Sequence, residues 1–233
     1  MKRFYEEVKT IAEGDGWAVL LDGKSIKTPV KQVLLLPTIS LAEKVVQEWQ
    51  KQGDEIVPLS MPLTRYANAT IDRTRTMRDD VIEQICAFGQ SDMLCYRVDK
   101  PADLVERQLT EWQPVLDWLS VSRDINLSIT AGIIQIDQDP LALERLKRAV
   151  SVFDDFQLTG LHAVTTGCGS IALGLAIAEG HIDCAETLEL ATLEEHHQMG
   201  LWGEDPETMR RHDELRREIF NANQFMTLAM PGS

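Results

Sequence analysis

The sequence has few cysteines and no long hydrophobic run. Its four cysteines are Cys86, Cys95, Cys168 and Cys184, and none belongs to a C-x-x-C pair. A chain of 233 residues can bury a core without disulfide bonds. Reduced, buried thiols are therefore expected instead of a disulfide framework or a metal cage. The most apolar stretch, residues 171–178, is much too short to span a bilayer.

Basic residues are scarce compared with acidic ones. The chain has 23 Lys and Arg against 37 Asp and Glu, which gives a formal net charge of −14. A protein that binds duplex nucleic acid normally needs a basic face to neutralise phosphates, and an anionic membrane surface repels an acidic protein. The sequence therefore predicts no nucleic-acid partner and no membrane insertion. A protein partner with a basic or mixed surface fits this charge balance.

No motif for catalysis or cofactor binding is complete. There is no G-x-S-x-G elbow. Residues 167–172 loosely resemble a dinucleotide-binding turn, but the next segment has a helical pattern, so a short buried helix of small residues is the preferred interpretation. Glu194-x-x-His197 has the spacing of a di-metal bundle site and lacks the second pair that such a site needs. No catalytic residue, cofactor or metal is predicted.

The pattern of turns and apolar residues predicts an α+β fold. Asp22-Gly23 between two apolar runs is a strong hairpin signal. We expect a small antiparallel β-rich domain with one helix over residues 1–60, and a mainly helical domain over 61–233. Within the second domain, Pro114 should divide a long helical pattern, and residues 128–136 could be a short strand. The tail from Asn221 is expected to fray.

The segment around Trp202-Gly203 carries the most functional information. From Ala185, steps of three and four place Leu188, Glu195 and Trp202 on one helical face, with Gln198 one turn further on than Glu195. A carboxylate on an apolar face is costly unless it is paired. Glu195 is therefore either half of a structural ion pair or, with Gln198, part of a contact surface.

The residues at the end of this helix, like Glu195, can be interpreted as structural or as contacts for a partner. Trp202 is interpreted first as a core anchor at the helix end, where Gly203 can terminate the helix. Glu204 and Asp205 precede a helix expected over residues 207–219, where negative charge is favourable. These two carboxylates are thus either solvated groups at a helix start or contacts for a partner.

A polar cluster is expected near the domain boundary. Arg65, Asn68 and Asp72 share one face if their segment is helical. The preferred interpretation is a buried Arg–Asp pair, completed by Asn68, that fixes how the two domains meet. The alternative is a polar contact patch.

Blocks along nearly the whole chain resemble the assembly chaperones that bind the alpha subunit of the F-type ATP synthase catalytic head. The C-terminal block is Glu195-x-x-Gln198-x-x-x-Trp202-Gly203-Glu204, followed by His212-Asp213. The earlier blocks, in order, are residues 2–5, 17–23, 27–29, 61–65, 67–68, 71–72 and 91–97. The stretch from Glu204 to His212 is longer than the compact family pattern and contains Pro206.

This resemblance implies a chaperone without catalysis or fuel. Such a protein would mask the free alpha subunit until the beta subunit displaces it, using Glu204 as the key acidic residue, with Asp205 as the alternative, beside Trp202, Glu195 and Gln198. The resemblance also implies a bacterial cytoplasmic location here and a mitochondrial one for eukaryotic members. Two rivals stay open: an enzyme of unknown class with a spatially assembled acidic site, and a general holdase without a fixed client.

Overall fold

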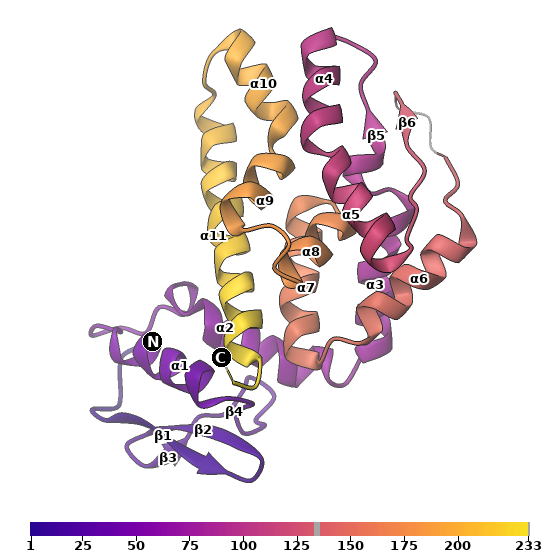
Figure 1. The fold of residues 1–233 in the computed structure, drawn as a ribbon. Helices are drawn as coiled ribbons and strands as arrows, with labels where there is room; N and C mark the ends of the chain where they lie inside the picture. Colours follow the sequence, from indigo (N-terminus) through magenta and orange to yellow (C-terminus); the bar gives the residue numbers. More distant parts are fainter. Residues whose placement is uncertain (133–135, 233) are drawn as a thin grey trace. The chain divides into compact units, whose positions relative to one another are not determined.

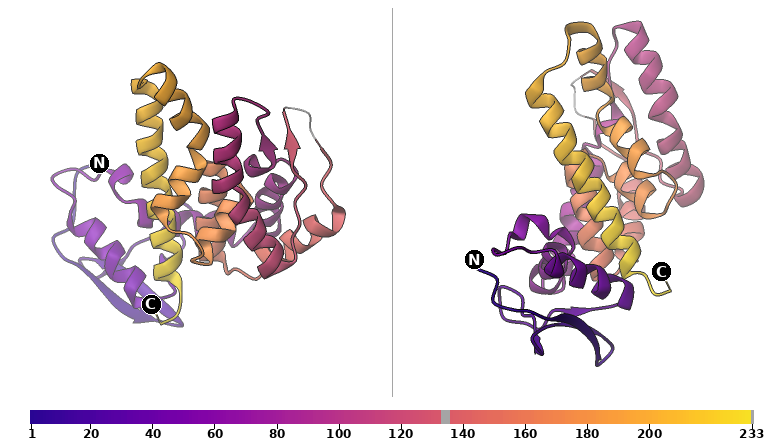
Figure 2. Two further views of the ribbon diagram at one scale, coloured as in Figure 1. Left: turned by 45° about the horizontal axis from the view of Figure 1, so that its top comes forward. Right: turned by 90° about the vertical axis from the view of Figure 1, so that its left-hand side faces the viewer.

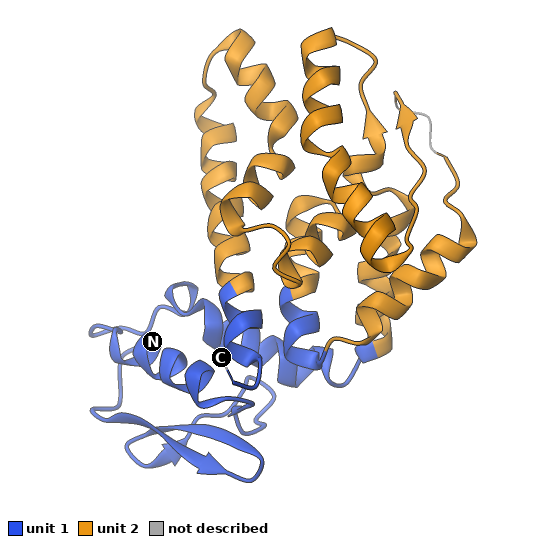
Figure 3. Cartoon of the chain, in the orientation of Figure 1, with its two compact units in different colours: residues 1–78, 154–160, 224–233 blue, residues 79–153, 161–223 orange. Residues whose placement is uncertain are grey.

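A computed structural model describes residues 1–132 and 136–232 of the chain. These residues divide into two compact units (Figure 3). Unit 1 comprises residues 1–78, 154–160 and 224–233, and unit 2 comprises residues 79–153 and 161–223. Unit 1 thus contains all of the region 1–60 that was expected to be β-rich. A small antiparallel sheet precedes a larger helical region, so the predicted α+β class is confirmed.

The sheet of unit 1 is built on a tight hairpin (Figure 1). β1 (Val8–Glu13) pairs antiparallel with β2 (Gly16–Leu21), and β2 also pairs with β3 (Lys24–Ser25) and β4 (Leu35–Leu36). Asp22 and Gly23, with φ of 47° and 79°, make the predicted turn between β2 and β3. The carboxylate of Asp22 also accepts hydrogen bonds from the backbone N–H groups of Glu6 and Glu7.

The core of unit 1 forms between this sheet and helix α1 (Ile39–Gln50). Thr38 caps α1 by accepting from the N–H of Leu41, and an apolar stripe along the helix is buried. Phe225 from the end of α11 joins the same apolar cluster. The remaining elements of unit 1 are a 3₁₀ turn (Pro58–Ser60), α2 (Pro62–Ala69) and a π-helical turn (Thr70–Thr74).

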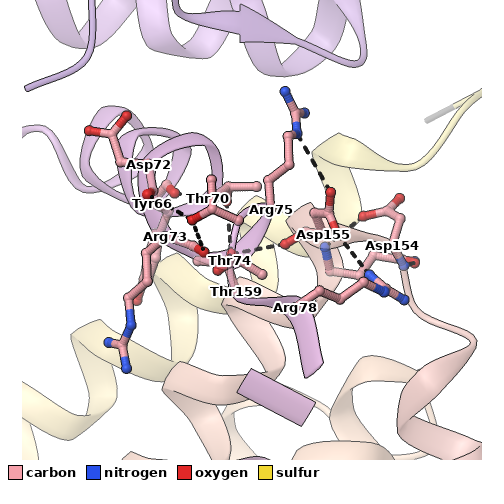
Figure 4. Close-up of polar contacts among 12 residues, drawn as sticks. Tyr66, Thr70, Asp72, Arg73, Thr74, Arg75, Arg78, Asp154, Asp155 and Thr159 are labelled. Carbon is pink, nitrogen blue, oxygen red and sulfur yellow. Dashed lines mark hydrogen bonds and ion pairs between the residues drawn. The ribbon is translucent and has the colours of Figure 1, made fainter. Parts of the chain in front are cut away.

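A buried hydroxyl cluster ties the π-helical turn to the start of α7 (Figure 4). Thr159 Oγ1 lies 2.8 Å from both Thr70 Oγ1 and Thr74 Oγ1, and it donates to the Asp155 carbonyl oxygen at 2.9 Å. At the edge of the cluster, Arg78 pairs with the Asp155 carboxylate at 2.7 Å. Buried hydroxyls are costly unless they are hydrogen-bonded, and Thr159 supplies a partner to both of the other threonines.

Unit 2 is a group of helices with one two-stranded parallel sheet, β5 (Tyr96–Arg97) with β6 (Thr130–Ala131). α7 begins and α11 ends within unit 1. The helices are α3 (Arg78–Ala87), α4 (Ala102–Glu111), α5 (Gln113–Arg123), α6 (Pro140–Ser151), α7 (Asp155–Cys168), α8 (Ile171–Ala178), α9 (Cys184–Ala191), α10 (Leu193–Trp202) and α11 (Pro206–Ala229), with 3₁₀ turns at Phe88–Gln90 and Met93–Cys95.

The centre of unit 2 is the buried helix α8, whose N-terminus is held by Asp92. The Asp92 carboxylate accepts hydrogen bonds from the N–H groups of Leu94 and Ala172 and from the Ser170 hydroxyl, all at 2.8–3.0 Å. Asp92 is fully buried, and its burial raises the pKa of this carboxyl despite the opposing hydrogen bonds. A Cβ atom at Gly174 would collide with Thr165. A short buried helix of small residues is present as predicted, but it spans Ile171–Ala178 instead of residues 167–172, because α7 ends at Cys168 and Gly169 turns with a φ of 67°.

Several local predictions are confirmed and others are corrected. Pro114 lies at the start of α5 and separates it from α4, as predicted. The stripe expected from Ala185 to Trp202 is two helices, because α9 ends at Ala191 and α10 starts at Leu193. The expected fraying from Asn221 is wrong: α11 continues to Ala229 since Phe225 and its neighbours are buried.

Two further observations bear on the sequence predictions. The short strand expected within residues 128–136 is present as β6, while residues 133–135 of that stretch lie outside the described residues. Among the described residues, no helix is both long enough and apolar enough to cross a bilayer.

The two units differ sharply in charge. Unit 1 contains 12 basic and 12 acidic residues, whereas unit 2 contains 11 basic and 25 acidic residues. The entire net charge of −14 therefore falls in unit 2.

Candidate functional site

The site occupies the tip of unit 2, where α10 and the first half of α11 form an antiparallel hairpin (Figures 1 and 2). Gly203 ends α10 with a φ of 91°, a conformation that residues with a Cβ rarely adopt. Asp205 then caps α11 by accepting from the backbone N–H and the hydroxyl of Thr208, at 2.9 and 2.8 Å. These hydrogen bonds hold the pKa of the exposed Asp205 carboxyl below its usual value.

A cleft of about 500 Å³ opens between the two helices of this hairpin. On α10 it is lined by residues that repeat at steps of four, which places them on one helical face. These residues are Glu194, Glu195, Gln198, Met199 and Trp202. On the other side, the cleft is lined by Gly203, Glu204, Asp205, Thr208 and Arg211. All five residues predicted to bind a partner therefore line one cleft.

The rim of the cleft is apolar and open to solvent. Trp202 is 79% exposed and its neighbour Leu201 is 60% exposed. The first interpretation of Trp202, as a core anchor, is therefore wrong. Gly203 ends the helix at the tip of the hairpin, where the indole has no protein layer above it. An exposed tryptophan next to an exposed leucine marks a contact surface more often than a free surface.

Glu195 is the centre of an ion-pair network that joins the two helices. Its Oε1 pairs with Arg211 Nη2 and its Oε2 with His212 Nε2, both at 2.5 Å. The ring of His196 meets the His212 ring edge-on, with centroids 4.9 Å apart. Burial alone would raise the pKa of Glu195, but the hydrogen bonds and charges of His212 and Arg211 hold it below the ordinary value. The structural pairing expected for Glu195 is thus formed.

Glu194 anchors α10 to α4 and also lines the cleft. Gln108 Nε2 donates to Glu194 Oε1 at 2.6 Å. Burial raises the pKa of Glu194, and the hydrogen bond from Gln108 only partly opposes this effect. The metal interpretation of Glu194-x-x-His197 gains no support, since His197 Nδ1 lies 3.8 Å from Asp103. The described residues contain no group of three or more side chains able to hold a metal ion.

Glu204 differs from the other carboxylates of the cleft. It is exposed, and among the described residues no hydrogen bond or ion pair involves its side chain. Gln198 is exposed as well. The cleft therefore presents an unpaired carboxylate beside an uncovered indole.

The polar cluster expected from Arg65, Asn68 and Asp72 belongs to unit 1. Arg65 is exposed, and within the described ranges no ion pair joins it to Asp72, whose Oδ2 accepts from the N–H of Val30 at 3.3 Å. The expected buried pair is not formed. Asn68 Oδ1 and Asp72 Oδ1 are buried without a hydrogen-bond partner in the described structure. Further along this segment, Arg75 and Arg78 pair with Asp155 (Figure 4).

The cysteines are poor candidates for nucleophiles. Burial raises the pKa of Cys86 to about 11 and those of Cys95 and Cys168 to about 12. At neutral pH these groups are thiols, and the thiolate is the reactive form. Cys184 is partly buried, and burial raises its pKa too.

Sequence reasoning missed part of the cleft. Glu194 was considered only as a metal ligand, although Glu194, Gln198 and Trp202 are spaced four residues apart and so share a face. Arg211 carried no signal, because its position opposite Glu195 depends on how the hairpin closes. The spacing could have found Glu194, whereas Arg211 required the tertiary structure.

Comparison with known proteins shows similarity along the whole chain. Residues 2–120 match the family described as ATP12 chaperone protein. The chain is 23% identical over 214 residues to the protein atp12, mitochondrial, of Schizosaccharomyces pombe, which covers 87% of this chain and 74% of that protein. Among solved structures, Atp12 from Paracoccus denitrificans is 38% identical with a TM-score of 0.95, and each chain is covered to 98%.

Two further solved structures are similar. A variant of the Paracoccus denitrificans protein, in which lysine replaces one aspartate, matches with the same identity and TM-score. The Atu1473 protein from Agrobacterium tumefaciens is 34% identical with a TM-score of 0.92, covering 98% of this chain and 85% of that one.

Proposed function

The chain belongs to the ATP12 chaperone family, which makes it an ATP synthase assembly chaperone, and we propose that its client is the unassembled alpha subunit of the F-type enzyme. The protein binds the free alpha subunit and masks the surface that later meets the beta subunit. An isolated subunit of an obligate complex exposes an interface that resembles half of a domain core, and such a surface aggregates unless it is covered.

The cleft between α10 and α11 is the proposed client-binding site. The observation that carries this assignment is the 79% exposure of Trp202 beside the unpaired carboxylate of Glu204. At protein interfaces, the residues that contribute most of the binding energy are often large aromatics surrounded by polar groups. Glu204 is the proposed key acidic residue, with Asp205 as the alternative, and Glu195 and Gln198 complete the contact surface.

The chaperone works without catalysis or nucleotide in this proposal. The sequence has no phosphate-binding loop, and the buried cysteines are protonated at neutral pH. Release then occurs by competition: the beta subunit displaces the chaperone once its own interface with the alpha subunit has the lower free energy. Acidic groups around the cleft set the register and the rate of association more than the affinity.

We propose a bacterial cytoplasmic site of action. The chain is 38% identical to the Paracoccus denitrificans protein and 23% identical to the mitochondrial protein of Schizosaccharomyces pombe. Neither a nucleic acid nor a membrane-inserted state enters the proposal, in keeping with the acidic charge of the chain.

A pull-down with purified alpha and beta subunits tests the choice of client. The alpha subunit should be retained and the beta subunit should not, and added beta subunit should elute the bound alpha subunit. Glu204→Lys should abolish retention. Glu207→Lys is the matched control, since Glu207 is also exposed at the start of α11 but does not line the cleft. Retention of the beta subunit in preference to the alpha subunit would refute the proposal.

A further inference from the structure

Some carboxylates that line the cleft between α10 and α11 already have partners within the protein, and others do not. Glu195 is occupied by Arg211 and His212. Asp205 is occupied by the two hydrogen bonds that cap α11. Glu194 accepts a hydrogen bond from Gln108 of α4. The Glu204 side chain has no hydrogen bond or ion pair among the described residues, so the open acceptors beside Trp202 are the two oxygens of Glu204.

The open acceptors share the cleft with a flat aromatic surface. Trp202 lines the cleft and is 79% exposed, and the described residues include no ring stacked against its indole. The face of an indole attracts cations, and a guanidinium group can stack on it while its edge remains free for hydrogen bonds. A carboxylate next to an indole face therefore suits a planar cation.

Electrostatics select a cation over an anion or a neutral group. Among the described residues, the single basic side chain that lines the cleft is Arg211, which is already paired with Glu195. Unit 2 carries the whole net charge of −14, and such a field raises the local concentration of cationic groups.

Between the two basic side chains, geometry favours arginine. A lysine ammonium is a compact, strongly hydrated charge without a planar face. A guanidinium has donors along its edges and a flat, weakly hydrated face, so it can make two parallel hydrogen bonds to one carboxylate and stack on an indole at once.

We propose that the cleft receives an arginine side chain exposed on the client, with its guanidinium stacked on Trp202 and paired with Glu204. This inference rests on the proposed function only in taking the natural ligand to be a protein. It identifies the recognition element of that protein as an arginine in an exposed, partly apolar segment.

The test uses the full chain and short capped peptides that contain one arginine, one lysine or one citrulline. Nuclear magnetic resonance spectra of the ¹⁵N-labelled protein follow the indole N–H of Trp202 and, in every variant, the backbone N–H of Gly203 during titration. The arginine peptide should shift this signal in a saturable way. The lysine peptide should bind about threefold more weakly, because an ammonium is more strongly hydrated and cannot combine flat stacking with two parallel hydrogen bonds. The citrulline peptide, which is neutral, should not bind.

Substitutions distinguish specific binding in the cleft from nonspecific attraction of a cation to the negative charge of unit 2. Glu204→Gln and Trp202→Leu should each weaken binding of the arginine peptide by about three- to fivefold. Glu207→Gln removes the same charge from outside the cleft and should leave binding unchanged. Equal binding of arginine and lysine peptides, equal effects of Glu204→Gln and Glu207→Gln, or no saturable shift would each overturn the inference.

The inference and the proposed function fail separately. Saturable arginine binding in a protein that does not retain the alpha subunit would refute the client and leave the arginine site standing. Retention of the alpha subunit by Trp202→Leu and Glu204→Gln, with no arginine-induced shift, would refute the arginine site and leave the client standing.

Discussion

Unit 1 and unit 2 differ in their net charge and in the kind of polar group that each of them buries. Unit 1 balances 12 basic against 12 acidic residues, and its buried polar cluster consists of neutral threonine hydroxyls. Unit 2 carries the full net charge of −14, and the polar group buried at its centre is the carboxylate of Asp92. Under the proposed function, unit 2 presents the electrostatic surface to the client. The difference also predicts that polar substitutions have unequal effects on the two units.

The largest effect is expected at the centre of unit 2. Asp92→Ala would leave the buried N–H groups of Leu94 and Ala172 without an acceptor. Because unmade buried hydrogen bonds to a carboxylate are expensive, the free energy of unfolding should fall by about 3–5 kcal/mol. Urea denaturation measures this loss. Ser170→Ala, which removes one donor to Asp92 and the cap of α8, serves as a milder variant if Asp92→Ala does not fold.

The matched control is Asp183→Ala. Asp183 caps α9 by accepting from the N–H groups of Ala185 and Glu186, but these hydrogen bonds are exposed to water. Its loss should cost about 1 kcal/mol. If Asp92→Ala costs no more than Asp183→Ala, the central role given to Asp92 is wrong.

A smaller effect is expected at the hydroxyl cluster of unit 1. Thr159→Val keeps the shape of the side chain and removes the hydroxyl that meets Thr70 and Thr74. Unfolding free energy should fall by about 1–3 kcal/mol, because the two remaining hydroxyls lose a buried partner. Thermal unfolding measures the change. Thr227→Val, at an exposed position of the same unit, should change stability by less than about 0.5 kcal/mol.

Much of the fold could be predicted from local signals in the sequence. Asp22-Gly23 specifies its hairpin because both residues must adopt positive φ, and Pro114 separates α4 from α5 because it has no N–H to donate. Both effects act over a few residues. The end of α11 was missed because Phe225 is held by the apolar cluster of unit 1, which includes residues far away in the sequence.

The sequence predicted which residues belong to the candidate site, but it did not predict which of them are exposed to solvent. Helical spacing placed Glu195 and Trp202 near one another, and the structure brings both to one cleft. The core position expected for Trp202 was wrong because helical periodicity identifies a face without saying what covers it. Likewise, the expected buried pair of Arg65 with Asp72 is not formed, whereas Arg75 and Arg78 pair with Asp155, which comes from a segment that no local pattern could select.

A still smaller, pH-dependent effect is expected at Glu195. Its folded-state pKa lies below the ordinary value of 4.5, so the ionised carboxylate stabilises the fold. This contribution is complete above about pH 4.5 and disappears as the pH falls through the folded-state pKa. Glu195→Gln should therefore lower the free energy of unfolding by about 0.5–1 kcal/mol at pH 7, since the partly exposed pair is screened by solvent.

The same variant should match the native protein in acid. Chemical denaturation of both proteins between pH 7 and about pH 3 measures the difference across the titration. A difference that stays constant with pH would mean that Glu195 stabilises the hairpin by packing alone.

The smallest effect on stability is expected at Trp202. Its side chain is 79% exposed, so Trp202→Ala should change the free energy of unfolding by less than about 0.5 kcal/mol. Trp112, which is 1% exposed and donates from Nε1 to the Leu190 carbonyl at 2.9 Å, is the contrasting position. Trp112→Ala should cost about 3–5 kcal/mol. A large loss of stability in Trp202→Ala would show that the indole is structural.

The central claim is that the hairpin of α10 and α11 binds the alpha subunit. Hydrogen–deuterium exchange of the full chain, measured with and without purified alpha subunit, tests it most directly. The predicted result is slower exchange in peptides that cover residues 193–211, with little change in the strands β1 and β2 of unit 1. Unchanged exchange over residues 193–211, together with protection confined to unit 1, would contradict the account.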